Sequence, residues 1–333
     1  MGYIVAESSA YHLYRYICSV SRKNSLEIYH SIDEFKRLDK AVVTIGTFDG
    51  VHKGHRVIVD RLREIARQVN GEVVVLTFFP HPRMILFPDD HGLLLLNTIK
   101  ERTSLMAKAG VQHFIIHPFS KDFSRKSSTE FVRDILVNKL GVKKLVIGYD
   151  HHFGRNREGS FEDLEELAPV YDFEVERIAE QDVNNVAVSS TKIRNALLSG
   201  DVTTAHDFLG YEYSVSGKVI KGKQIGRTLG FPTANVEVAE DYKLIPANGV
   251  YAARAIWKER VLNGVMSIGN RPTFDNGLRS IEIHIFDFND EIYGETLTIQ
   301  FVKYIRPELK FSGADELVAA MHKDKATALK LFV

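Results

Sequence analysis

Residues 41–55, AVVTIGTFDGVHKGH, join a short apolar run to a glycine-rich turn and a pair of histidines. The run Ala41–Ile45 is apolar without interruption, which is typical of a strand that is buried on both faces. Apolar residues then recur at helical spacing from His55 to Val69, and Gly71 ends that pattern. The stretch therefore predicts a strand, a tight turn and a helix in direct succession.

The same alternation continues through the first half of the chain. Further strands are predicted at residues 72–78, 114–116 and 145–147, and further helices at residues 98–109 and 128–140. Continuous apolar strands that alternate with helices indicate a parallel sheet covered on both faces. The first half is thus predicted to be an α/β domain.

The second half has a different pattern, which changes near residues 201–211. Strands separated by Gly, Asn and Pro turns are predicted at residues 213–220, 249–257, 261–268, 281–288 and 297–304. Their hairpin-scale spacing indicates an antiparallel barrel or sandwich, and an amphipathic helix over residues 315–330 is expected to close it. We therefore expect an N-terminal extension (1–25), a first domain (26–205) and a second domain (206–333).

Length and composition narrow the class of protein. The chain has 333 residues, enough for two domains, with 43 basic and 43 acidic residues. A net charge of zero gives no overall attraction to nucleic acid or to an anionic membrane. A single cysteine, Cys18, excludes an intramolecular disulfide. No apolar run is long enough to span a membrane, and the N-terminus is not typical of a secretory signal. We expect a cytoplasmic protein that uses neither nucleic acid nor membrane and is a monomer or weak homo-oligomer.

The turn after the first strand has the composition of a phosphate site. Ligands bind at the carboxyl ends of parallel strands, and Gly46, Gly50 and Gly54 would let the backbone approach one closely. His52 and His55 lie at a helix N-terminus, where the backbone N–H groups and the helix dipole favour anions. Two imidazoles there could donate to the phosphates of ATP. The alternative is a pair of surface histidines in a turn.

Two further segments carry groups that suit polyphosphate. Residues 189–194, SSTKIR, open a helix with hydroxyls and two cations, although the same letters make a good helix cap with exposed basic residues. Residues 217–235, GKVIKGKQIGRTLGFPTAN, combine four glycines with four cations, and Gly222 and Arg227 are the candidates for contact with ATP. This segment has no Walker A motif, and a basic hairpin loop is its alternative interpretation.

The order of the motifs resembles one family over nearly the whole chain. GTFDGVHKGH (46–55) resembles the HxGH signature of the nucleotidyltransferase superfamily. With LTFFPHPR (76–83), GYDHHFGRNREG (148–159) and SSTKIR, it resembles the adenylyltransferase half of prokaryotic bifunctional FAD synthetases. GFPTAN (230–235), GVYA (249–252), GNRPTF (269–274), EIHIFDF (282–288) and RPELKF (306–311) resemble the riboflavin kinase half. The resemblance implies a Rossmann-like nucleotidyltransferase domain followed by an antiparallel β-barrel riboflavin kinase domain with a closing helix.

The resemblance also implies roles for individual residues of the first half. The residues implied around ATP are Gly46, Phe48, Gly50, His52, His55, Ser190, Thr191 and Arg194, with His52 and His55 as catalytic groups. The residues implied near the flavin or its phosphate are Phe78, Pro80, His81 and Asp150. Phe78 could equally be a core residue, and Pro80 could simply shape the loop. His151 and His152 depart from the family pattern, and adjacent histidines are poorly disposed to share a metal ion.

For the second half the resemblance implies kinase chemistry on riboflavin. Thr233 and Asn235 of the PTAN box would supply oxygen ligands to Mg²⁺, which suits a hard cation. Glu282 would accept the proton of the attacking alcohol. Without the family, Glu282 would be interpreted as an exposed strand glutamate. Arg306 would lie near the flavin, although a core or surface role is an open alternative.

The predicted function is therefore ATP-dependent phosphorylation of riboflavin to FMN and adenylylation of FMN to FAD, with Mg²⁺ as cofactor. Three alternatives stay open at this point. One half could merely bind flavin, the whole chain could be a flavin sensor without turnover, or the first half could serve another nucleotidyltransferase reaction. The β-rich second half with PTAN and GNRPTF argues against the last of these.

Overall fold

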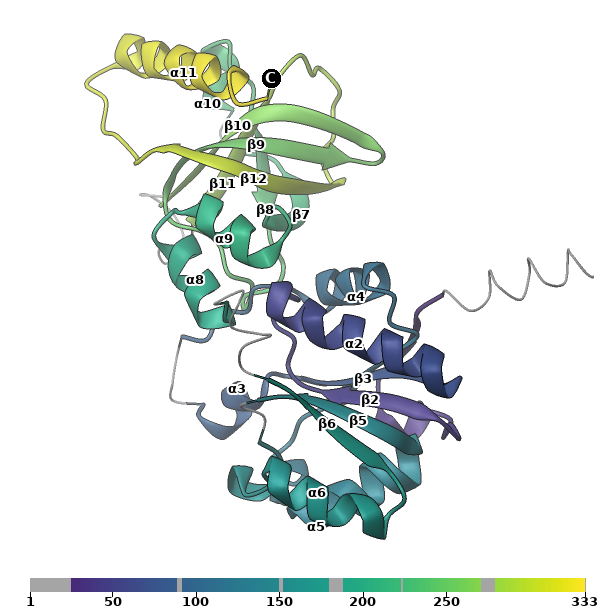
Figure 1. Ribbon diagram of the computed structural model, residues 1–333. Coiled ribbons are helices and arrows are strands. Elements are labelled where there is room, and N and C mark those ends of the chain that lie inside the picture. The colour runs from purple at the N-terminus through teal and green to yellow at the C-terminus, as the bar shows by residue number, and fades with distance from the viewer. Residues whose placement is uncertain are drawn as a thin grey trace, which may run out of the picture. The chain divides into compact units, whose positions relative to one another are not determined.

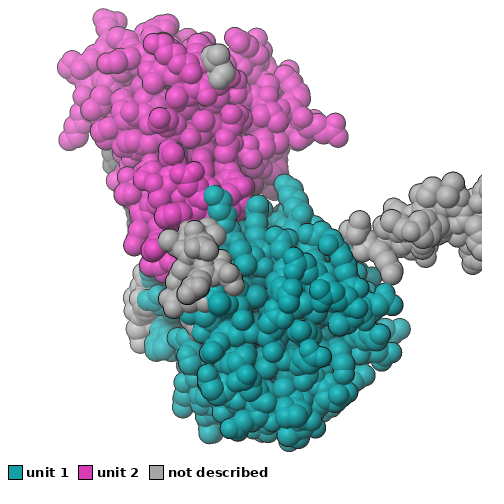
Figure 2. Space-filling model, viewed as in Figure 1, with its two compact units in different colours: residues 1–93, 99–187 teal, residues 94–98, 188–333 magenta. Residues whose placement is uncertain are grey.

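The computed structural model describes residues 25–88, 92–149, 152–179, 188–222, 224–270 and 279–332. The chain divides into two compact units. The first comprises residues 1–93 and 99–187, and the second comprises residues 94–98 and 188–333 (Figure 2). The N-terminal extension expected over residues 1–25 lies outside the described residues except for Ser25.

The first unit contains the predicted parallel sheet. All its strand pairs are parallel, and the strand order is β1-β4-β3-β2-β5-β6. The strands are β1 (Glu27–Tyr29), β2 (Ala41–Ile45), β3 (Glu72–Phe79), β4 (His113–Pro118), β5 (Val142–Gly148) and β6 (Glu174–Ile178). Because β2 pairs with β3 on one side and β5 on the other, the order reverses at β2. The carboxyl ends of β2 and β5 therefore form the crevice where open α/β sheets bind ligands.

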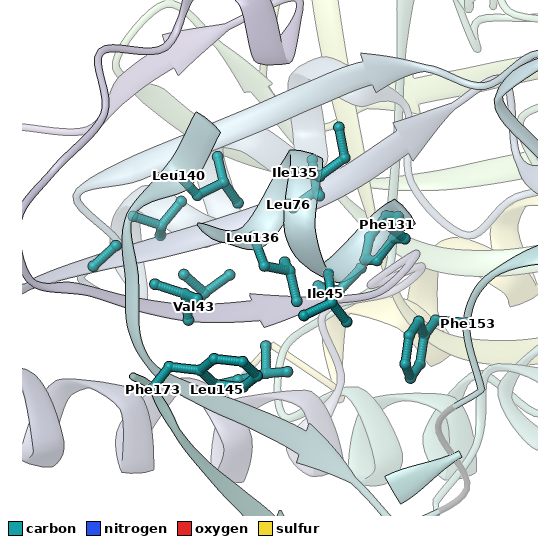
Figure 3. Packing of buried hydrophobic residues seen from close by; sticks show 14 of the residues in the cluster. Val43, Ile45, Leu76, Phe131, Ile135, Leu136, Leu140, Leu145, Phe153 and Phe173 are labelled. Carbon is teal, nitrogen blue, oxygen red and sulfur yellow. The ribbon is translucent and has the colours of Figure 1, made fainter. Parts of the chain in front are cut away.

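Helices cover both faces of this sheet (Figure 1). One face packs against α2 (Lys53–Val69) and α4 (Ile99–Lys108), and the other against η3 (Phe131–Leu140) and α6 (Phe161–Val170). Side chains alternate along a strand, so Val42 faces the α2 layer while Val43 and Ile45 face the η3 layer. Figure 3 shows Val43 and Ile45 among the apolar side chains of that second layer.

Shorter elements complete the unit. They are η1 (Ile32–Glu34), α3 (Pro82–Leu86), η2 (Phe123–Arg125), α5 (Ser128–Glu130) and η4 (Arg155–Arg157). The helix predicted over residues 128–140 is present, but it widens into π-helical turns from Phe131 onward and ends at Gly141, whose φ is 69°. Glycine suits that left-handed position because it has no Cβ.

The second unit begins with α8 (Ser190–Leu198) and α9 (Val202–Leu209) and continues into a closed antiparallel barrel. The barrel order is β10-β11-β8-β7-β12-β9, so of the two predicted architectures the barrel is confirmed. The strands are β7 (Ser214–Ile220), β8 (Ala234–Glu237), β9 (Gly249–Trp257), β10 (Arg260–Asn270), β11 (Arg279–Ile285) and β12 (Thr296–Arg306). A short helix, α10 (Ile225–Thr228), lies between β7 and β8.

The predicted closing helix is also confirmed. Helix α11 (Ala314–Leu329) packs on the barrel, where Ala328 joins Ala252 and Phe286 in a buried cluster. Within the described ranges, no helix combines the length and the apolar character that a membrane crossing requires.

A short segment, residues 94–98, joins the second unit before the chain returns to α4. Leu95 is fully buried and exchanges backbone hydrogen bonds with Tyr242 and Leu244, at 2.7 and 2.9 Å. The buried ammonium of Lys243 donates to the Leu96 carbonyl at 2.7 Å. These bonds make the segment part of the second unit.

Candidate active sites

The turn between β2 and α2 is strained. The φ angles of Phe48, Gly50 and Val51 are 48°, 92° and 38°, all in the left-handed region. That region is unusual for Phe and an outlier for β-branched Val, and such residues cost roughly 1–3 kcal/mol each. Phe48 and Val51 are both buried in the core on the α2 face, which holds the turn in this conformation. Strain of this kind concentrates at functional sites.

The two histidines of the motif are not surface side chains: His52 is buried and His55 is partly buried. Helix α2 begins at Lys53, two residues before the predicted start, so His52 is its N-cap. His52 Nδ1 accepts the backbone N–H of His55 at 3.3 Å, and the two rings stack with centroids 3.6 Å apart. Because Nδ1 accepts a hydrogen bond, a neutral His52 carries its proton on Nε2. Nε2 is thus the nitrogen that can donate to an anion at the start of the helix.

His55 is held in its neutral form. Part of the residue reaches the surface, but Phe48 packs edge-on against its ring at 5.1 Å and His52 stacks on it. Burial, and then the charges of His52 and Arg102, lower the pKa of His55 well below its ordinary value. Its buried Nδ1 has no hydrogen-bond partner within the described residues. A neutral imidazole beside a strained turn is a typical feature of a functional site.

A buried ion pair, which no sequence motif indicated, lies next to this turn. Arg102 Nη2 of α4 lies 3.6 Å from Asp49 Oδ1, and each side chain is 1% exposed. Burying two charges costs several kcal/mol of desolvation per ion, which their attraction offsets only when the geometry of the pair is good. Asp49 stands inside the quoted motif, but nothing in the sequence around Arg102 shows that α4 packs against it.

Of the residues implied near the flavin or its phosphate, Phe78 lies near the end of β3 and Pro80 and His81 follow it, whereas Asp150 follows β5 in the sequence. Phe78 is buried and contacts Phe119 and Phe123, with ring centroids 5.6 and 5.5 Å away, so it contributes to the core whether or not it also meets a ligand. Pro80 is exposed after a cis peptide bond, and His81 caps α3 by accepting the N–H of Arg83 at 3.1 Å. Asp150 and His151 lie outside the described residues, and His152 is exposed.

Helix α8 carries the third predicted ATP segment, within the second unit. Ser189 caps it by accepting the N–H of Lys192 at 3.3 Å, so Ser190 and Thr191 stand in its first turn. Arg194 Nε donates to the Leu94 carbonyl at 2.8 Å. SSTKIR therefore does cap a helix, as its alternative interpretation expected. That Ser190, Thr191 and Arg194 bind the same nucleotide as His52 and His55 stays a prediction.

A cavity of about 270 Å³ opens between the barrel and α11. It brings together Thr233, Glu282 and Arg306, which stand in three separate sequence motifs, and Phe311, which ends the same motif as Arg306. The rest of its wall is mostly apolar. Its apolar lining residues are Leu229, Phe231, Val250, Val265, Leu309, Leu317 and Met321. A flat apolar ring with a polar chain would match this combination.

The polar end of the cavity is built by the PTAN box and β11. The Thr233 hydroxyl donates to Glu282 Oε2 at 3.3 Å, and Asn235 lies directly opposite Glu282 in the ladder between β8 and β11. A Cβ on Gly222 would collide with the Asn235 carboxamide, and one on Gly226 with the Phe231 carbonyl. The two glycines therefore let the loop lie close to the PTAN box. Arg227 is exposed on α10.

The oxygen atoms gathered there suit a hard cation. Thr233 Oγ1, the Asn235 carboxamide and the Glu282 carboxylate offer oxygen donors, the ligand type that Mg²⁺ prefers. No three His, Cys, Asp or Glu side chains gather into a metal site anywhere in the part of the chain that the structure describes.

Arg306 lines the same cavity but is firmly paired. Its Nε and Nη2 donate to both carboxylate oxygens of the buried Asp324 of α11, at 2.9 and 2.7 Å, and Nη1 donates to the Pro307 carbonyl at 3.0 Å. Its guanidinium lies 5.8 Å from the centre of the Phe311 ring. Arg306 thus joins β12 to α11 in addition to facing the cavity.

Comparison with known proteins matches two family models to successive parts of the chain. A family model described as FAD synthetase matches residues 34–192, and one described as riboflavin kinase matches residues 209–332. Among curated relatives, the bifunctional riboflavin kinase/FMN adenylyltransferase of Listeria monocytogenes is 39% identical over 92% of this chain and 98% of its own. The proteins of the same name from Escherichia coli and Bacillus subtilis are each 36% identical, over 87% and 88% of this chain and 92% and 93% of their own.

A solved structure is similar over most of the chain. It is titled a macrolide-efflux protein from Streptococcus pneumoniae, and it superposes with a TM-score of 0.81 at 31% identity, covering 91% of this chain and 98% of its own. The efflux activity in that title is stated of that protein alone.

Proposed function

The chain belongs to the family of bifunctional riboflavin kinase/FMN adenylyltransferases, and from this premise we propose which residues carry each reaction. It phosphorylates riboflavin with ATP to give FMN, and it transfers an adenylyl group from ATP to FMN to give FAD and pyrophosphate. We assign adenylyl transfer to residues 26–205 and phosphorylation to residues 206–333.

The kinase proposal rests on one observation: Glu282 lies in the barrel cavity, within hydrogen-bonding distance of the Thr233 hydroxyl. In the proposed step, the terminal hydroxyl oxygen of the ribityl chain attacks the γ-phosphorus of ATP. The new O–P bond forms as the bond to the ADP oxygen breaks, and the hydroxyl proton passes to the Glu282 carboxylate. Thr233 orients that carboxylate by donating to Oε2.

The apolar wall of the cavity supports riboflavin as the acceptor. Phe231, Val250 and Met321 offer a surface for a flat aromatic ring, and Arg306 holds α11 over it through Asp324. In this arrangement the ring packs between barrel and helix while the ribityl hydroxyl reaches Glu282.

We propose Mg²⁺ as the cofactor, with Thr233 and Asn235 as the residues that would hold it. When bound, the ion neutralises charge on the phosphates of ATP. Gly222 and Gly226 keep the loop close to these two side chains, and Arg227 adds a cation on the loop for the nucleotide.

For adenylyl transfer, a phosphate oxygen of FMN attacks the α-phosphorus of ATP, and the bond to the pyrophosphate oxygen breaks. The phosphate is already ionised near pH 7, so no strong base is required. The protein supplies donors instead: His52 through Nε2, His55, and the backbone of the turn at Gly46, Phe48 and Gly50. On this proposal Ser190, Thr191 and Arg194 complete the ATP site, and Phe78, Pro80, His81 and Asp150 border the FMN.

The proposed setting follows from composition. A net charge of zero favours small-molecule substrates over nucleic acid or membrane, and one cysteine fits a reducing cytoplasm. We place the enzyme there as a monomer or weak homo-oligomer.

The kinase assignment is tested with Glu282→Gln. Removing the base is expected to lower phosphorylation of riboflavin by roughly 100- to 10,000-fold. Glu237→Gln is the matched control, because Glu237 is an exposed strand glutamate opposite Lys218 in the ladder between β7 and β8. Both variants are assayed for FMN formation by chromatography. Equal activity in the two variants would show that Glu282 is only another strand glutamate.

A further inference from the structure

His284 shares a strand face with Glu282. Along β11 the isoleucines Ile281, Ile283 and Ile285 are buried, while Glu282 and His284 between them face the cavity. The alternation follows from the two-residue period of a strand. His284 therefore stands one strand repeat from the proposed base, and the roles assigned above leave it unused.

One nitrogen of the His284 ring is bonded to the PTAN box. His284 Nδ1 lies 2.9 Å from the Pro232 carbonyl oxygen. A carbonyl oxygen can only accept, so the proton of this bond stands on Nδ1. The Phe231 ring packs edge-on against the imidazole with centroids 5.2 Å apart, which fixes the plane of the ring.

The surroundings keep this imidazole neutral. Burial lowers the pKa of His284 below its ordinary value, and the Lys325 ammonium of α11 acts in the same direction. The Pro232 carbonyl and Asp287 act against them. With the proton on Nδ1, the neutral ring presents Nε2 as an acceptor only.

The bond occurs where the strand ladder stops. The described pairs between β8 and β11 end at Ala234 opposite Ile283, and Pro232 has no N–H with which to extend them. The His284 side chain thus attaches the chain at Pro232 to β11 just beyond the last ladder pair. Thr233 lies between these two attachments, and its hydroxyl meets Glu282.

We propose that His284 is a positioning residue of the kinase step: its Nδ1–H holds Pro232, and with it Thr233, beside Glu282. This inference rests on the proposed role of Glu282 as the base. It assigns to His284 no contact with the reacting atoms and no proton transfer.

Three substitutions separate the two ring nitrogens. An asparagine amide reaches roughly the position of Nδ1, and a glutamine amide that of Nε2. His284→Ala is expected to lower kcat for riboflavin phosphorylation by roughly 10- to 100-fold, with a smaller change in KM for riboflavin. His284→Asn is expected to recover most of kcat because it can still donate to the Pro232 carbonyl, whereas His284→Gln is expected to stay close to the alanine variant.

Two controls accompany these variants. His322→Asn is the matched control, because His322 is exposed on α11 and its ring packs on the same Phe231 ring at 4.9 Å. It is expected to keep wild-type kinase activity. Trp257 is the single tryptophan of the chain and lies on β9, so its fluorescence during urea unfolding shows whether the barrel is folded in each variant.

Wild-type kcat in His284→Ala would overturn the inference. So would recovery by glutamine but not asparagine, which would show that Nε2 carries the function, or a failure of asparagine to exceed alanine. Glu282→Gln is measured in the same series. If that variant is inactive while His284→Ala is fully active, only the inference fails. If Glu282→Gln itself is fully active, the proposed base assignment fails first.

Discussion

At the scale of single residues, the proposed mechanism gives the two nitrogens of His52 different roles. Nδ1 caps α2 by accepting the His55 N–H at 3.3 Å, and this bond leaves the proton on Nε2. The same ring is therefore a structural cap and, on the proposed mechanism, a donor to the phosphates of ATP. The two contributions can be separated by substitution.

His52→Asn is expected to keep the cap and lose the donor. Asparagine is a favoured N-cap residue, and its side-chain oxygen can replace Nδ1 as the acceptor. FAD formation from FMN is expected to fall roughly 100- to 1,000-fold, while the side-chain cap of α2 is kept. His52→Ala is expected to lose the cap as well, which lowers the free energy of unfolding by about a further 1 kcal/mol. Wild-type FAD formation by His52→Asn would refute the donor role.

His55 makes the stability of the first unit depend on pH. The pKa of His55 is lower in the folded protein than in the unfolded chain, so below about pH 6.5 the unfolded chain binds more protons. His55 therefore makes its full contribution to the free energy of unfolding above that pH, and this contribution is lost as the pH falls. Half-buried His117, whose pKa is lowered mainly by burial, changes stability in the same direction.

Urea unfolding followed by circular dichroism between about pH 5 and pH 8 measures this effect. Below about pH 6.5, we expect protonation of His55 to lower the free energy of unfolding by up to about 1.4 kcal/mol for each pH unit. In His55→Gln this part of the pH dependence is expected to be absent. Trp257 fluorescence records the barrel separately, since no other tryptophan is present. The same acid dependence in His55→Gln would contradict the assignment.

At the scale of secondary-structure elements, long apolar strands were predictable and short ones were not. β2 and β9 were predicted with the bounds that they have, because their apolar content alone specifies a buried strand. β1 and β8 have three and four residues, and they exist because neighbouring strands pair with them. The sequence could not decide between barrel and sandwich, since that depends on which edge strands meet.

Residues of the candidate sites also fall into a group that the sequence predicted and a group that it did not. Thr233 and Glu282 stand in recognisable motifs, and the fold brings their side chains within 3.3 Å. Arg102 and His284 carry no local signal of their partners, because an ion pair with Asp49 and a bond to Pro232 exist only after helices and strands have packed. A single sequence does not predict the role of a residue when that role depends on a partner that is distant in the sequence.

The contact between β12 and α11 leads to a prediction about riboflavin binding. If Arg306 acts by holding α11 through Asp324, then Arg306→Gln and Asp324→Asn are each expected to raise KM for riboflavin, and the double variant is expected to be no worse than either. The coupling free energy from this double-mutant cycle is expected to be about 0.5–3 kcal/mol. A near-normal KM in Asp324→Asn alone would instead point to direct contact between Arg306 and the flavin.

At the scale of the whole molecule, the proposed assignment gives each reaction the groups that its nucleophile needs. The ribityl alcohol is a poor nucleophile, and the barrel cavity provides a carboxylate for its proton. The FMN phosphate is already ionised, and the turn before α2 provides donors and a helix N-terminus. Because His52 and Glu282 lie in different compact units, a substitution of either one is expected to leave the other reaction intact.

The most direct test of this account is one time course of riboflavin, FMN and FAD, followed by chromatography with ATP and Mg²⁺. The wild-type chain should form FMN and then FAD. Glu282→Gln should convert supplied FMN to FAD but leave riboflavin unchanged, and His52→Asn should accumulate FMN with little FAD. Loss of both reactions in either variant, or FMN that never becomes FAD in the wild type, would contradict two separate sites in one chain.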